Sequence, residues 1–216
     1  MSQPTVREAI RVLEATGFVR VEHGRGTFVH GGVQHFIARS LETLLELEHV
    51  GIVEVHEVRT ALAQFSIAQA AQRASADDLA EVERRHEAIV ALSGDEDTYV
   101  IADAIIAFHV AVSRAAHNPL LLALETFLIR IIVDFMVKAV LEGYTENWID
   151  TVRMRIPQRE AILNALRSRD ADRSLAVTNS YLDSQRAAFL RNKGINSLRL
   201  ANPGALRLVS TAVVRQ

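Results

Sequence analysis

The sequence contains no cysteine, which excludes a disulfide framework and thiolate chemistry and fits a reducing compartment. Proline and glycine are scarce, with four and ten among 216 residues, and the abundance of alanine, leucine and arginine favours helix over sheet. The net charge is only −2, so the whole chain is not a general polyanion binder. Uncharged runs such as 60–72 are shorter than the roughly 18 residues that cross a bilayer. We therefore expect a cytoplasmic protein without a membrane segment.

Residues 2–17 have the pattern of a helix that ends at a glycine. Apolar side chains recur in this stretch every three or four positions, and Gly17 can adopt the positive φ that often terminates a helix. Two short strands follow, at 18–22 and 27–29, with a basic, glycine-containing turn between them. A helix followed at once by a small hairpin with a basic tip predicts the recognition helix and the wing of a DNA-binding head.

The remainder of the chain has helical periodicity almost to the end. Ser75 and Asp78 are spaced for a capping box at the start of one helix. The run 118–142 is apolar on nearly all sides, as in a buried central helix. The expected helices are 36–48, 53–74, 75–92, 98–116, 118–142, 148–169 with a break at Pro157, and 170–193.

Three segments of the head together resemble the second half of the winged helix-turn-helix of GntR-type regulators: Pro4–Ile10, Glu14–Val19 and Gly24–Val29. The helical part resembles the FCD effector domain of the FadR-like branch of that family. The matching segments there are Glu57–Leu62, Phe108–His109, Ala115–Leu120, Ala161–Leu166, Asp170 and Tyr181–Leu182.

This resemblance implies a mostly α fold, in which an antiparallel bundle of six or seven helices follows a partial winged helix-turn-helix of recognition helix and β-hairpin wing. We expect the partial DNA-binding domain at 1–30, the ligand-binding and dimerisation domain at 34–193 and a tail at 194–216. Heads of this family begin with two further helices, so the resemblance also implies that part of the head precedes Met1.

Members of this family often hold a divalent metal with one aspartate and three histidines. The positions that match this ligand set carry Ile105, His109, Arg159 and Tyr181, so one of the four ligands is present. Asp103 lies six residues from His109 and therefore on a different helix face, and an arginine repels a cation. We therefore expect no metal and no other cofactor.

A guanidinium group can replace the metal as the binder of an anion, because its planar donors match a carboxylate or a phosphate. The resemblance implies that Arg59 and Arg159 face the bundle interior, where His109 and Tyr181 add neutral donors. This predicts a small anionic effector of the carboxylate type. Other interpretations remain open: Arg159 can pair with Glu160 or face solvent, and His109 and Tyr181 can be ordinary core residues.

In the head, the resemblance implies DNA contacts on the recognition helix and at the tip of the wing. The helix residues are Ser2, Gln3, Thr5 and Arg7, and the wing residues are His23, Gly24 and Arg25. Hydroxyl groups and a helix N-terminus suit phosphates, whereas Arg7 can bind guanine or the backbone. The alternative is that Arg7 and Arg11 form a solvated helix face with neighbouring glutamates.

These patterns predict a ligand-responsive transcriptional regulator, in which an effector bound by a homodimeric bundle changes the binding of the heads to a double-stranded DNA operator. One alternative is an effector-binding and dimerisation module that does not bind DNA in this form. An all-α enzyme is a further alternative, but the sequence shows no paired carboxylates, nucleophile–base pair or phosphate-binding loop.

Overall fold

The computed structural model describes residues 3–15, 19–22, 24–29, 44–45, 47–92, 97–145 and 148–197. Its N-terminal elements are α1 (Gln3–Ala15), β1 (Val19–Glu22) and β2 (Gly26–Val29). The two strands are antiparallel, with Val19 opposite Val29 and Glu22 opposite Gly26. The expected helix and hairpin of the head are therefore both present, whereas Ser2, Gly17 and His23 lie outside the described residues.

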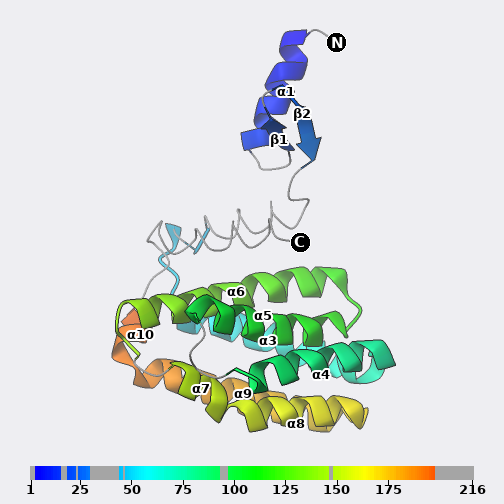
Figure 1. Ribbon diagram of the computed structural model, residues 1–216, viewed down its shortest axis with the longest axis vertical. Helices are drawn as coiled ribbons and strands as arrows, with labels where there is room; N and C mark the ends of the chain where they lie inside the picture. Colours follow the sequence, from blue (N-terminus) through cyan, green and yellow to red (C-terminus); the bar gives the residue numbers. More distant parts are fainter. Residues whose placement is uncertain are drawn as a thin grey trace.

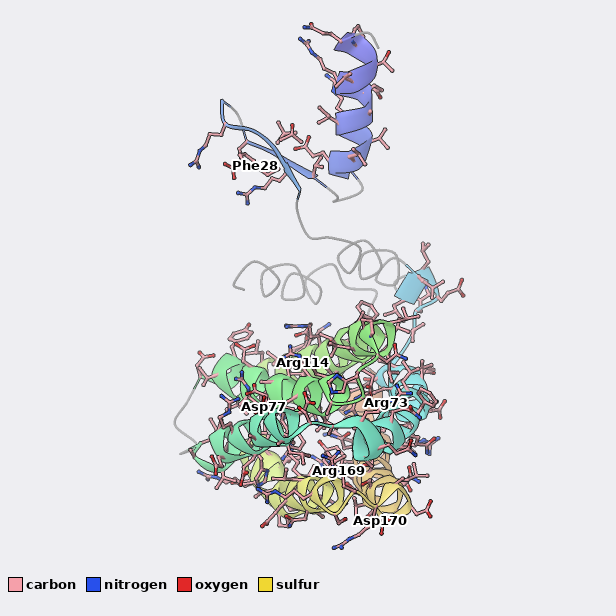
Figure 2. The ribbon with its side chains drawn as sticks, turned by 90° about the vertical axis from the view of Figure 1, so that its right-hand side faces the viewer. Phe28, Arg73, Asp77, Arg114, Arg169 and Asp170 are labelled. Carbon is pink, nitrogen blue, oxygen red and sulfur yellow. The ribbon has the colours of Figure 1, made fainter. Side chains whose placement is uncertain are left out.

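The turn of this hairpin depends on glycine. Gly24 and Gly26 have φ angles of 78° and 118°, which residues with a Cβ rarely adopt. The Val21 amide donates to the Glu14 carboxylate over 3.2 Å and so connects β1 to α1. Phe28 on β2 is half exposed on this small unit (Figure 2).

The second unit is a bundle of helices with short connections (Figure 1). Its helices are α3 (Ile52–Arg73), α4 (Ala76–Val90), α5 (Thr98–Arg114), α6 (Pro119–Leu141), α7 (Trp148–Met154), α8 (Ile156–Arg167), α9 (Ala171–Arg191) and α10 (Lys193–Ser197). α3 has a central position, because α5, α6, α8 and α9 all pack against it. This arrangement directs side chains from α3, α5, α8 and α9 into one interior.

Side-chain caps explain where four of these helices begin. The Ser75 hydroxyl accepts from the Asp78 amide while the Asp78 carboxylate accepts from the Ser75 amide, so the expected capping box is confirmed at α4. Asp97, Asn118 and Asp170 accept from main-chain amides in the first turns of α5, α6 and α9. Arg169 and Asp170 form the turn that joins α8 to α9 (Figure 2).

The long apolar helix α6 is buried or half-buried from Leu121 to Val140, in line with the expectation for 118–142. It contributes side chains to three separate apolar clusters, including Leu121, Phe127 and Ile129, each at most 5% exposed. Its Leu120, however, is 62% exposed. Among the described residues, the exposed large apolar side chains of α6 are thus confined to its two ends, Leu120 and Leu141.

Two boundaries also differ from those expected. The helix 148–169 breaks at Arg155, two residues before the expected Pro157, and α8 begins at Ile156. Pro157 has no N–H to donate to the preceding turn, so it interrupts a continuous helix but is tolerated in the first turn of a new one. The expected tail begins with the short helix α10, whose Ile195 is buried.

Most of the expected helix 36–48 lies outside the described residues. Of the helices that are described, none is both long enough and apolar enough to span a membrane.

Candidate functional site

The structure brings the four predicted ligand-binding residues together in the bundle interior. Arg59 comes from α3, His109 from α5, Arg159 from α8 and Tyr181 from α9. Their exposed fractions are 4%, 8%, 2% and 1%, respectively. Two arginines at this depth need an explanation, because a buried charge is costly unless it is paired and hydrogen-bonded.

Three of these residues form a closed ring of hydrogen bonds with Gln185 of α9. Arg59 Nη2 lies 3.1 Å from His109 Nδ1, and His109 Nε2 lies 2.9 Å from Tyr181 Oη. The Gln185 amide donates to Tyr181 Oη over 2.9 Å and accepts from Arg59 Nη1 over 3.4 Å. The ring holds the Tyr181 side chain in place from two sides.

The direction of every bond in this ring follows from Arg59. A guanidinium can only donate, so His109 Nδ1 must accept and its Nε2 carries the proton that is donated to Tyr181. Burial, followed by the charges of Arg59 and Arg159, lowers the pKa of His109 well below its ordinary value, so the imidazole of His109 is neutral. Tyr181 Oη thus accepts two bonds and keeps its own proton for a further acceptor.

Arg159 lies beside this ring and has few partners of its own. Its Nη1 donates to the Val152 carbonyl over 2.9 Å, and its guanidinium carbon is 5.7 Å from the centre of the Tyr181 ring. Its Nε has no hydrogen-bond partner among the described residues. None of the ion pairs in the described part of the chain involves Arg159, so the alternative pairing with Glu160 is not seen there.

A cavity of about 160 Å³ adjoins Arg159. Arg155 and Arg159 both line it, and its described lining contains no acidic residue. Burial, together with the charge of Arg159, lowers the pKa of Arg155, although Tyr181 opposes this shift. The rest of the wall is mostly apolar and includes Trp148 and Phe189. A cavity with two cations and no acid is suited to an anion.

A smaller cavity, of about 30 Å³, is lined by three residues of the ring and has room for water. Arg59, Tyr181, Glu125 and Thr178 are among its lining residues. Glu125 Oε2 and Thr178 Oγ1 have no partner among the described residues. Burial raises the pKa of Glu125, although the hydroxyls of Ser113 and Ser66 and the charge of Arg59 oppose this.

The interior does not fit the divalent metal that the family resemblance implies. Ile105 and Arg159 offer no ligand atom for a cation, and both ring nitrogens of His109 are engaged by Arg59 and Tyr181. Within the described residues there is no group of three histidine, cysteine, aspartate or glutamate side chains that could hold a metal ion.

The predicted DNA-binding residues of the head lie on the surface. Gln3, Thr5 and Arg7 are exposed on α1, and Gly24 and Arg25 are exposed in the turn of the hairpin. The remaining two predictions, Ser2 and His23, fall outside the described residues.

Nearby glutamates compensate part of the positive charge of the head. Arg25 lies 3.3 Å from Glu22, so the turn is less basic than its sequence indicates. Arg11 pairs with Glu8 at 3.6 Å, as a solvated helix face would.

Three further interior residues were not predicted from the sequence, although the sequence contains an indication of each. Gln185 and Arg155 stand four residues after Tyr181 and four before Arg159, a spacing that places residues on one helix face. Glu125 is one of only two carboxylates in the strongly apolar α6, and an acidic residue is rarely fully buried unless it is paired.

Comparison with known proteins agrees with this architecture. Residues 54–184 match the FCD domain family. The chain is 29% identical over 178 residues to the galactonate operon transcriptional repressor of Escherichia coli, with 79% of this chain and 73% of that protein covered. It is 26% identical over 136 residues to the HTH-type transcriptional regulator LutR of Bacillus subtilis, with 63% and 61% covered.

Two solved structures share the fold. Streptococcus agalactiae GntR superimposes with a TM-score of 0.64 at 17% identity, covering 87% of this chain and 83% of the other. E. coli McbR/YncC superimposes with a TM-score of 0.55 at 17% identity, covering 86% and 83%. The FCD match over most of the helical bundle and the regulators that it resembles show that this chain belongs to the FCD-domain branch of the GntR-family transcriptional regulators.

Proposed function

We propose that this regulator is controlled by a small anionic effector that binds in the helical bundle, against Arg159, and changes the affinity of the N-terminal unit for an operator in double-stranded DNA. The observation that carries the proposal is the state of Arg159. Its guanidinium is buried at 2% exposure, has no acidic partner among the described residues and adjoins a cavity large enough for a small molecule. A carboxylate there would satisfy a charge that the described protein groups leave uncompensated.

The other interior residues support this site in different ways. Arg155 adds a second positive charge to the same cavity. Arg59, His109 and Gln185 hold Tyr181, and the Tyr181 ring lies against the Arg159 guanidinium. Of the four predicted ligand-binding residues, we therefore assign direct effector contact to Arg159. Arg59, His109 and Tyr181 are instead assigned the role of holding Arg159 in position.

The proposed DNA contacts are those of α1 and the hairpin turn. Gln3, Thr5 and Arg7 project from the exposed first turns of α1, where they can reach phosphates and base edges. Arg25 is 78% exposed at its side chain and could exchange its contact with Glu22 for a phosphate. Both curated relatives named above are transcriptional regulators, and one of them is named for a galactonate operon.

Thermal denaturation in a panel of sodium carboxylates at constant ionic strength tests the effector site. A ligand that binds only the folded state adds about 2.7 kcal/mol of stability at a concentration 100 times its Kd. We expect at least one carboxylate to stabilise the protein and Arg159→Met to remove that effect, whereas Arg153→Met on neighbouring α7 retains it. Equal stabilisation of wild type and Arg159→Met by every carboxylate would contradict the proposal.

Selection of duplexes from a random DNA pool tests the operator contacts. We expect an enriched inverted repeat, as for a two-fold symmetric regulator. Arg7→Ala should weaken binding to the enriched duplex, whereas Arg11→Ala, which removes a residue already paired with Glu8, should change it little. If Arg11→Ala weakens binding as much as Arg7→Ala does, the assignment of the DNA-facing side of α1 is wrong.

A further inference from the structure

The walls of the 160 Å³ cavity carry information about the effector beyond its charge. We propose that the effector is a carboxylate with a compact, apolar, ring-sized body, rather than a polyhydroxylated acid. This inference rests on the proposed function, because it concerns the same cavity and the same Arg159. It specifies the chemistry of the part of the effector that Arg159 does not contact.

The size of the cavity sets the first limit. A protein cavity of about 150 Å³ lined by aliphatic and aromatic side chains accepts a molecule as large as benzene. The present cavity, of about 160 Å³, has nearly the same volume. A six-membered ring therefore fills it, whereas long acyl chains and nucleotides do not fit without rearrangement.

The apolar part of the wall sets the second limit. Trp148 of α7, Phe189 of α9 and Ile195 of α10 line the cavity, and each is at most 6% exposed. Further aliphatic side chains from α5 and α6 complete this wall. Burying an apolar body against such side chains is favourable by roughly 25 cal/mol for each Å² removed from water.

The polar part of the wall is almost fully engaged within the protein. Gln185 donates to Tyr181 and accepts from Arg59. Asn192 donates to the Tyr144 carbonyl over 2.8 Å and accepts from the Ile195 amide over 3.1 Å.

Few partners therefore remain for a ligand with many hydroxyl groups. Apart from the arginines, the remaining polar groups of the described lining are the hydroxyls of Thr145 and Thr151 and the indole N–H of Trp148, which are too few for a row of hydroxyls. Each unmatched ligand hydroxyl would lose its hydrogen bonds to water, and such losses disfavour binding.

Part of this wall lies outside the segment that matches the FCD family. Phe189, Asn192 and Ile195 lie after the segment 54–184 that matches the FCD family. α10 places Ile195 at the cavity, and it stays there because Asn192 links the end of α9 to Tyr144. The C-terminal end of α9 together with α10 is thus a specificity-determining segment of this chain.

Trp148 gives a direct optical test, because it is the one tryptophan in the sequence and it lines the cavity. The protein is titrated with cyclohexanecarboxylate, gluconate and cyclohexylmethanol, none of which absorbs where tryptophan is excited. We expect a saturable change of Trp148 emission with cyclohexanecarboxylate, and a Kd for gluconate and for cyclohexylmethanol at least about tenfold higher, since a charge-assisted hydrogen bond or a buried ring is worth that factor or more.

Variants at both ends of the cavity make the test specific. Arg159→Met should raise the Kd for cyclohexanecarboxylate at least about tenfold, and Arg153→Met should not. Ile195→Ala should shift the preference from cyclohexanecarboxylate toward its 4-ethyl derivative, and Ile195→Val, a milder change, should do so to a smaller extent. An Ile195→Ala protein that keeps the wild-type preference overturns the role given to α10.

The outcomes separate this inference from the proposed function. Tighter, Arg159-dependent binding of gluconate than of cyclohexanecarboxylate overturns the apolar-body inference and leaves the anionic effector site in place. Equal binding of cyclohexylmethanol and cyclohexanecarboxylate overturns the role of Arg159 in both. Absence of binding by every carboxylate in the thermal panel also overturns both.

Discussion

At the scale of single residues, the interior depends on one chain of donors that starts at Arg59. Because a guanidinium cannot accept, Arg59 determines the tautomer of His109, and His109 in turn directs its proton to Tyr181. Gln185 completes the ring with both ends of its amide engaged. Tyr181 is therefore the common acceptor of the ring and the surface on which the Arg159 guanidinium rests.

Removing the Tyr181 hydroxyl should be costly. In Tyr181→Phe, the His109 Nε2–H and the Gln185 amide lose their acceptor while they stay buried, so we expect a loss of about 1–3 kcal/mol in the free energy of unfolding, measured by chemical denaturation. Tyr144→Phe removes a hydroxyl from a residue that is 44% exposed and should cost less than about 0.5 kcal/mol. Equal costs for the two variants would show that the ring adds nothing to stability.

Buried neutral histidines should make the protein sensitive to acid. Burial, followed by the charges of Arg59 and Arg186, lowers the pKa of His56 from 6.5 to about 4, and the pKa of His109 is lowered as well. As the pH falls below 6.5, the unfolded chain therefore binds more protons than the folded chain. The stability that comes from the neutral folded histidines is thus present above about pH 6.5 and is lost as the pH falls.

We expect the free energy of unfolding to fall by about 2 kcal/mol through His56 between about pH 6.5 and about pH 5, with a further decrease through His109. In His56→Gln the decrease over this interval should be smaller, because one of the two groups no longer titrates. Denaturant titrations at several pH values measure it. Identical pH profiles for wild type and His56→Gln would show that His56 is not the source.

The residues of the site could be predicted from the sequence more readily than their contacts. The positions of Arg59, His109, Arg159 and Tyr181 follow from short segments that resemble the FCD domain. The hydrogen-bonded ring cannot be predicted in this way, because Arg59 and Gln185 are 126 residues apart and only the packing of α3 on α9 brings them together. The charge balance of the cavity also depends on packing, since Arg155 is no more conspicuous in the sequence than an exposed arginine.

At the scale of elements, local signals determined the helix boundaries where a side chain acts on its own helix. The capping box of Ser75 and the cap at Asn118 are read directly from their spacing, and both helices begin there. The break at Arg155 could be foreseen only to within two residues, because a proline is tolerated at more than one position of a first helical turn. α10 could not be foreseen, because a helix of five residues is too short to show periodicity.

The close packing of α10 against Tyr144 leaves little room for a side chain at Gly194. A Cβ at this position would lie 2.5 Å from Tyr144 Cδ1 and 3.1 Å from Tyr144 Cβ, so the helix or the tyrosine must move. We expect Gly194→Ala to destabilise the protein by about 1–3 kcal/mol, as overpacking does, and to weaken the binding of cyclohexanecarboxylate by displacing Ile195. Lys193→Ala on the same helix is the control, and equal affinities for the two variants would show that α10 does not shape the cavity.

At the scale of the whole molecule, exposed apolar side chains on the bundle indicate an interface with a second chain. α3 and α6 pack against each other, and each also exposes large apolar side chains. Phe65 and Val58 of α3 are 54% and 56% exposed, and Leu120 of α6 is 62% exposed. A second copy of the chain that covers Val58 and Phe65 would remove these side chains from water.

We therefore predict a homodimer with Phe65 in its interface. Light scattering coupled to size-exclusion chromatography should give twice the chain mass at micromolar concentration, and Phe65→Glu should shift the protein toward the mass of one chain. Val90→Glu makes the same change at a similarly exposed position of α4 and should leave the mass unchanged. A single-chain mass for the wild type would contradict the prediction.

An anion bound to Arg159 is expected to change the affinity of the protein for DNA. The most direct measurement is the affinity for the selected duplex, by fluorescence anisotropy, with and without saturating cyclohexanecarboxylate, for wild type, Arg159→Met and Arg7→Ala. We predict that the carboxylate changes the Kd of the wild type, that Arg159→Met binds the duplex but no longer responds, and that Arg7→Ala binds it weakly. An undiminished response in Arg159→Met, or a wild type that binds the carboxylate without any change in DNA affinity, would contradict the claim.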